Sequence, residues 1–133
     1  MLNRKSSARI ASFFLIIHGL IEIAGLFLLN SIPLALISFG GLTGQALEQN
    51  SSTVAMYGLF WGVARLIAAW GSWSLRKWAL VLGMCMSLVT MVAAITIIPA
   101  GVTDTLFATP VLVLLLYTWF GNEIKEIGSM ARS

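Results

Sequence analysis

The sequence predicts an all-α protein, a bundle of four transmembrane helices with both termini in the cytoplasm. Of its 133 residues, 59% are hydrophobic and only 10% are charged, whereas a soluble domain carries about 25% charged residues. Four segments have the roughly 20 mostly apolar residues that a spanning helix needs. The composition excludes a soluble globular domain, a disordered chain and a nucleic-acid-binding module, and the length is that of one integral membrane domain, residues 1–133.

The first predicted span covers residues 10–29 and follows a basic segment that contains Arg4, Lys5 and Arg9. A cleaved signal peptide would have an apolar stretch of about 7–15 residues and a small-residue cleavage site after it. Here the apolar stretch is longer, and no good cleavage site follows. We therefore expect a retained first transmembrane helix, with a cleaved signal as the alternative.

A long connection, residues 30–53, follows on the extracytoplasmic side. It contains one proline, three glycines and two short apolar pieces, residues 34–39 and 42–47. Each piece is too short to span a membrane. Either the two pieces lie on the membrane surface as interfacial helices, or the connection is an ordinary folded loop.

The other three predicted spans are joined by tight turns, which makes them antiparallel neighbours. They cover residues 54–73, 78–98 and 102–120. Thr103 or Asp104 is placed to cap the start of the fourth span. Pro110 removes a helix hydrogen bond within it, so we expect a kink there.

The distribution of basic residues predicts the topology. If the four spans alternate in direction, seven Lys and Arg residues fall on one side, and the two opposite connections contain none. Basic residues accumulate on the cytoplasmic side, so both termini are expected in the cytoplasm of a protein integral to the inner or plasma membrane. An interfacial belt of aromatic and basic residues is expected at that side: Trp70, Trp73, Arg76, Lys77, Trp78 and Trp119.

Three strongly polar side chains fall inside the predicted spans: His18, Glu22 and Arg65. A charged group at this depth costs at least ~2.5–3.5 kcal/mol on insertion scales, so each is a candidate functional residue. His18 and Glu22 are four residues apart and share a helix face. At about 1.5 Å of rise per residue, Arg65 falls between them in depth. We predict an ion pair between Glu22 and Arg65, with His18 in reach.

The second span carries a face suited to close helix packing. Gly58, Gly62, Arg65 and Ala69 follow the spacing i, i+4, i+7, i+11, and Gly58-x-x-x-Gly62 lets another backbone approach closely. Arg65 therefore points into a helix contact. The ion pair either locks the first two helices together or belongs to a proton-responsive or substrate-binding site.

No arrangement of residues predicts catalysis. Met84-Cys85-Met86 resembles a soft-metal tract, but adjacent helical residues point about 100° apart, so packing is favoured over a shared ion. We expect no pair of carboxylates at membrane depth, no Cys/His metal spacing and no phosphate-binding loop. We predict no catalytic residues, no metal and no cofactor.

Residues 58–82 carry a resemblance. Gly58-Leu-Phe-Trp-Gly-Val-Ala-Arg65, then Trp70-Gly71 and Leu75-Arg76-Lys77-Trp78-Ala79-Leu80, resembles a hairpin of uncharacterised small four-helix membrane proteins of bacteria and archaea. The resemblance implies the same architecture with a basic, tryptophan-containing turn. The chain lacks the second acidic residue that some of those proteins carry just after the arginine.

Three functions are compatible with these features. The first is a non-catalytic accessory or scaffold subunit of a membrane complex, or a homo-oligomer, with the bilayer and other membrane subunits or itself as partners. The second is a small proton-coupled transporter or channel that uses Glu22 with Arg65 and His18. The third is a quinone- or lipid-binding module, which needs an apolar cleft near Trp70, Trp73 and Trp78.

Overall fold

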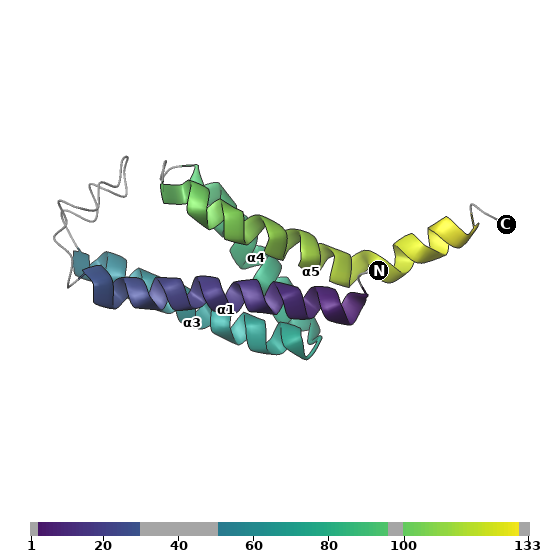
Figure 1. Ribbon diagram of the computed structural model, residues 1–133, viewed down its shortest axis with the longest axis horizontal. Coiled ribbons are helices and arrows are strands. Elements are labelled where there is room, and N and C mark those ends of the chain that lie inside the picture. The colour runs from purple at the N-terminus through teal and green to yellow at the C-terminus, as the bar shows by residue number, and fades with distance from the viewer. Residues whose placement is uncertain (1–2, 30–50, 96–99, 131–133) are drawn as a thin grey trace.

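The computed structural model describes residues 3–29, 51–95 and 100–130, and within these ranges the chain forms α-helices and no strand. The helices are α1 (Arg4–Leu29), α3 (Ser51–Trp73), α4 (Lys77–Ala94) and α5 (Ala100–Met130) (Figure 1). The all-α prediction is therefore confirmed. The apolar pieces at residues 34–39 and 42–47 lie outside the described residues.

Three of these helices are long and apolar enough to cross a membrane. They are α1 over Arg4–Gly25, α4 over its whole length and α5 over Gly101–Gly121. Residues 54–73, the predicted second span, lie in α3. Among the described residues, α3 is not one of the three candidate spans.

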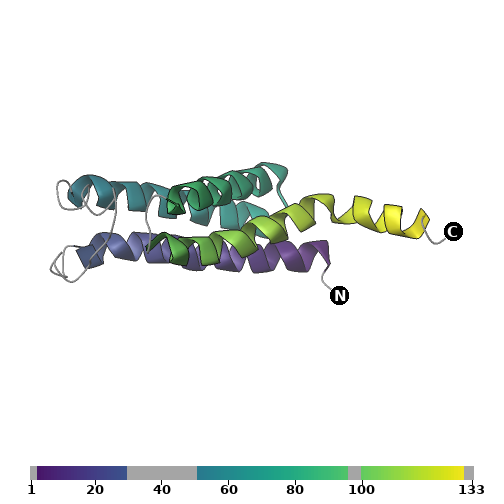
Figure 2. The ribbon, with the colours of Figure 1, turned by 90° about the horizontal axis from the view of Figure 1, so that it is seen from above.

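The four helices form a ring of antiparallel neighbours. α1 packs against α3 and α5, and α4 packs against the same two helices. Figures 1 and 2 show that the N-terminus and the α3–α4 turn lie at one end of the bundle, and that the C-terminal part of α5 extends beyond this end. We call this end, which carries Arg4, Lys5, Arg9, Arg76 and Lys77, the basic end.

Several helix bounds differ from the predicted spans. α1 begins at Arg4 rather than residue 10, because the Asn3 side chain caps it: its Oδ1 accepts a hydrogen bond from the Ser6 N–H at 2.7 Å. α5 continues through Pro110 and ends at Met130 rather than residue 120. The apolar stretch predicts where a helix can cross a membrane, but a helix ends only where its backbone is capped or interrupted.

The α3–α4 turn begins slightly earlier than the predicted turn at Arg76 and Lys77. Leu75 has a φ of 56°, and its N–H donates to the Ser72 carbonyl at 2.9 Å, while the Arg76 N–H donates to the Gly71 carbonyl at 3.0 Å. These two bonds form a Schellman motif, which ends a helix with one left-handed residue. The turn brings α4 back against α3 within three residues.

The apolar core fills the half of the bundle nearer the basic end. Its buried residues come from all four helices: Ala11, Leu15, Ala68, Ala69, Leu80, Met86, Val111 and Leu115. Buried hydroxyls in the same half bond to their own helix; Ser12 and Thr118, for example, donate to the carbonyls of Ala8 and Leu114. Such bonds let polar side chains pack inside apolar helix contacts. The polar side chains that bond between helices lie in the other half.

Candidate functional site

α1 and α3 cross where two glycines face each other. A Cβ atom on Gly62 would lie 2.7 Å from the Gly19 carbonyl oxygen, and one on Gly19 would lie 2.8 Å from the Gly62 carbonyl oxygen. On the predicted packing face, Gly62 and Ala69 are buried and Gly58 is half-buried against Glu22. Gly19 was not predicted, although its position one turn before Glu22 places it on the same face of α1.

Arg65 connects three helices. Its side chain is only 4% exposed, and its Nη1 atom forms an ion pair with the Glu22 carboxylate on α1. Its Nη2 atom donates a 2.6 Å hydrogen bond to the Thr90 hydroxyl on α4, and that hydroxyl donates in turn to the Met86 carbonyl. The Trp61 ring lies 6.0 Å from the guanidinium carbon. The predicted pair of Glu22 and Arg65 is therefore present, and Thr90 is an additional partner.

His18 contacts a different helix from Glu22. Its Nε2 atom lies 3.3 Å from the Asp104 Oδ1 atom, and its ring lies 5.3 Å from the ring of Phe107 on α5. We expected His18 close to Arg65. Residues four apart on a helix are offset by about 40°, so Glu22 reaches α3 while His18 reaches α5.

Asp104 corrects two predictions. Because α5 begins at Ala100, Asp104 lies inside the helix rather than at its cap, and it lines one cavity together with Glu22. The count of three strongly polar residues inside the predicted spans therefore missed Asp104, which lies within the apolar stretch of α5 over Gly101–Gly121. A signal was present in the sequence, since Asp104 begins a series with spacing i, i+4, i+7, i+11 whose other members, Ala108, Val111 and Leu115, are buried.

The polar residues surround a cavity of about 390 Å³ between the four helices, within the ~300–1,000 Å³ typical of ligand sites. We call it the axial cavity; it is lined by Glu22, Tyr57, Trp61, Arg65, Val89, Thr90, Ala93 and Asp104. Each helix contributes at least one of these residues. The cavity lies beyond the apolar core, in the half of the bundle away from the basic end.

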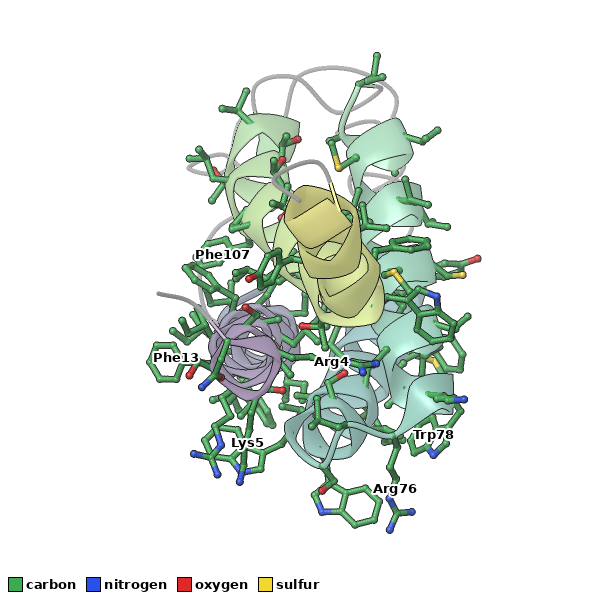
Figure 3. All side chains as sticks on the ribbon, turned by 90° about the vertical axis from the view of Figure 1, so that its right-hand side faces the viewer. Arg4, Lys5, Phe13, Arg76, Trp78 and Phe107 are labelled. Atoms are coloured by element: carbon green, nitrogen blue, oxygen red, sulfur yellow. The ribbon has the colours of Figure 1, made fainter. Side chains whose placement is uncertain are left out.

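The predicted interfacial residues gather at the basic end. All six are exposed: Trp70, Trp73, Arg76, Lys77, Trp78 and Trp119. The Arg9 guanidinium lies 5.4 Å from the centroid of the Trp73 ring, and that of Arg76 lies 5.0 Å from the centroid of the Trp70 ring. Figure 3 looks onto this end, where Arg4, Lys5, Arg76 and Trp78 are labelled. This surface is suited to an interface between membrane and water.

The Met84-Cys85-Met86 tract does not converge on a common point. Met86 is buried, Met84 is half-buried and Cys85 is exposed, as expected for adjacent residues of a helix. In the described ranges, no three His, Cys, Asp or Glu side chains come together as metal ligands.

A second cavity, of about 410 Å³, lies between α4 and α5. Its lining is mostly apolar: Met91, Ala94, Ile95, Gly101, Val102, Thr105 and Leu106. Neither this cavity nor the axial cavity is lined by the tryptophans of the basic end, near which a quinone- or lipid-binding module would need a cleft.

Comparison with known proteins finds no match to the chain, whether among protein-family models, curated proteins or solved structures. The resemblance of residues 58–82 stays a prediction, and the function must be argued from the geometry of the axial cavity.

Proposed function

We propose that this chain is an integral membrane protein with four transmembrane helices, in the inner or plasma membrane, and with both termini in the cytoplasm. Three helices have the length and apolarity to span, and α3 packs against two of them, α1 and α4. The ion pair of Arg65 with Glu22 reduces the cost of placing the Arg65 charge of α3 in the membrane. The grouping of basic residues at one end supports the orientation.

We further propose that the protein is a small proton-coupled transporter that binds its solute in the axial cavity. The observation that carries this proposal is the cavity itself, with two carboxylates and a guanidinium on its walls. An ion pair that only locks two helices requires neither a cavity beside it nor a second carboxylate on the cavity wall. Ionisable side chains that face a cavity at membrane depth are typical of substrate and proton paths.

Glu22 is the coupling carboxylate in this proposal. In its charged form it holds Arg65 and so holds α1 against α3 at the Gly19–Gly62 crossing. Protonation of Glu22 removes this attraction, because a neutral carboxyl group no longer pairs with a guanidinium as an ion. Proton binding and the α1–α3 contact are thereby linked, as a transporter that exchanges protons for a solute requires.

The test is proton movement in vesicles that contain the purified protein and a trapped pH-sensitive dye. Gradients of small amines, amino acids and carboxylates are imposed in turn, and at least one class should move protons in a protein-dependent way. Glu22→Gln should abolish the signal. The control, Glu126→Gln, changes a carboxylate near the C-terminal end of α5 and should retain it. If no solute moves protons, or if Glu22→Gln transports as well as the native chain, the proposal is wrong.

An accessory subunit remains a second candidate because of the outer face of α3. Its exposed side chains include several large apolar ones: Met56, Phe60, Ile67 and Trp70. In a membrane such a face is covered by lipid or by another subunit. Purification of the tagged protein in mild detergent distinguishes the two, since a stoichiometric larger partner supports the accessory role and a chain that purifies alone or with itself argues against it.

A further inference from the structure

The side chains that line the axial cavity carry a net negative charge. Its lining contains two carboxylates, Glu22 and Asp104, and one guanidinium, Arg65. Arg65 is engaged at both terminal nitrogens, by Glu22 and by Thr90. Asp104 faces only His18, which is charged only if protonated. With histidine counted as neutral, the described residues leave one negative charge of the cavity without a cation.

The walls around this charge are aromatic and apolar. Tyr57 and Trp61 contribute rings, and Val89 and Ala93 contribute aliphatic surface. The face of an aromatic ring attracts a cation, most strongly where water is excluded. The side chain of Asp104 is 46% exposed, so its carboxylate is accessible to a ligand in the cavity.

His18 contacts the Asp104 carboxylate without lining the cavity. The His18 side chain is 4% exposed, and its Nε2 atom lies 3.3 Å from the Asp104 Oδ1 atom. Asp104 lines the cavity and His18 does not.

We propose that the axial cavity binds a small organic cation, a monoamine with an apolar or aromatic group, whose ammonium pairs with Asp104. This inference rests on the proposed function and names its class of solute. A carboxylate ligand would face Glu22 and Asp104 and could pair with Arg65 only by displacing an existing partner. An amine meets an accessible carboxylate, and its apolar part meets the aromatic wall.

The test uses three probes of nearly the same shape and different charge: 2-phenylethylamine, 2-phenylethanol and phenylacetate. Binding to the purified native protein in detergent is measured by calorimetry at pH 8. A charge-assisted hydrogen bond contributes ~1.5–3 kcal/mol, so the amine should bind about tenfold or more tightly than the alcohol. Phenylacetate should bind more weakly than either.

Two variants test whether the ammonium group binds at Asp104. Asp104→Asn should weaken amine binding about tenfold and leave the alcohol unaffected, because it removes the charge and keeps the shape. Glu126→Gln should change neither, since residue 126 lies about 33 Å further along α5 at ~1.5 Å per residue.

The outcomes separate this inference from the proposed function. If the amine binds no better than the alcohol, if none of the three probes binds, or if Asp104→Asn binds the amine as the native chain does, the cation inference is wrong. Proton coupling to a different solute class in the vesicle assay would still support a transporter. If the vesicle assay shows no coupled solute at all, the transporter proposal itself fails.

Discussion

Arg65 is the side chain at which the polar contacts of three helices meet. Its charge is nine-tenths buried and is balanced by Glu22, with Thr90 as a further partner. When one partner of a buried pair is removed, the other charge stays in a medium that solvates it poorly, so loss of one partner costs more than the pair contributes in total. The stability of the site therefore depends on both partners together.

The first prediction concerns this ion pair. Glu22→Ala and Arg65→Ala should each destabilise the protein, by about 3–5 kcal/mol for a fully buried pair and less at Glu22, whose side chain is 22% exposed. The double variant should cost less than the sum of the two. Unfolding of the purified protein in detergent measures all three, with the exposed Arg9→Ala as the control. Strict additivity would refute the coupling.

A second prediction compares two buried threonines. Thr90 accepts a hydrogen bond from Arg65, whereas the Thr118 hydroxyl donates to the Leu114 carbonyl of its own helix. Thr90→Val should cost ~1.5–3 kcal/mol, the usual value for a bond to a charged group. Thr118→Val should cost clearly less. Equal losses in the two variants would show that the Thr90 hydroxyl does not support the guanidinium.

Among the elements, α1 and α3 approach each other closely at the Gly19–Gly62 crossing. At their crossing a backbone carbonyl occupies the space that a Cβ atom on the facing glycine would need. Backbone cannot move aside as the end of a flexible side chain can. The glycines therefore set the distance between α1 and α3, and with it the distance at which Glu22 meets Arg65.

The third prediction tests this crossing with matched glycines. Gly19→Ala and Gly62→Ala should each destabilise by about 1–3 kcal/mol, the usual cost of overpacking. Gly25→Ala places its Cβ in open space on the same helix as Gly19, so it should be neutral or stabilise by up to about 1 kcal/mol through helix propensity. Thermal unfolding ranks the three. A Gly62→Ala variant as stable as Gly25→Ala would contradict the close contact.

The spacing of residues within each helix predicted part of this arrangement. The i, i+4, i+7 series in α3 predicted that Gly62 and Arg65 face inward, and both are buried. The same rule applied to residues 100–115 would have placed Asp104 on the buried stripe of α5. We instead expected the fourth span to begin at residue 102, with Thr103 or Asp104 as its cap. The apolar character of a segment does not locate the residue at which a helix begins.

In the molecule as a whole, charge and apolarity are separated along the bundle axis. Basic and tryptophan side chains occupy one end, the apolar core lies next to them, and the axial cavity lies beyond the core. The apolar core therefore lies nearer the basic end, and the buried ion pair of Arg65 with Glu22 lies in the other half.

The fourth prediction concerns orientation in the membrane. In a Cys85→Ser background, which removes the single cysteine, Leu47→Cys should react with an impermeant thiol reagent added outside cells. Ser129→Cys should react only after the membrane is permeabilised. The reason is that all Lys and Arg residues except Arg65 fall in residues 1–9, 76–77 and 125–132, on one side of the membrane. The opposite labelling pattern would reverse the orientation.

The sequence alone determined the properties that depend on residues close together in the chain. These are the helical class, the lengths of the apolar stretches, the grouping of basic residues and the positions of Glu22 and Arg65 along their helices. It also predicted their pairing, because depth and helix face are both local properties. The tertiary structure decided which neighbour each polar side chain meets. His18 contacts Asp104, Arg65 bonds to Thr90 as well as Glu22, and a cavity lies beside these residues. The rotation of each helix about its axis is set by packing against two other helices, so no single segment of sequence determines it.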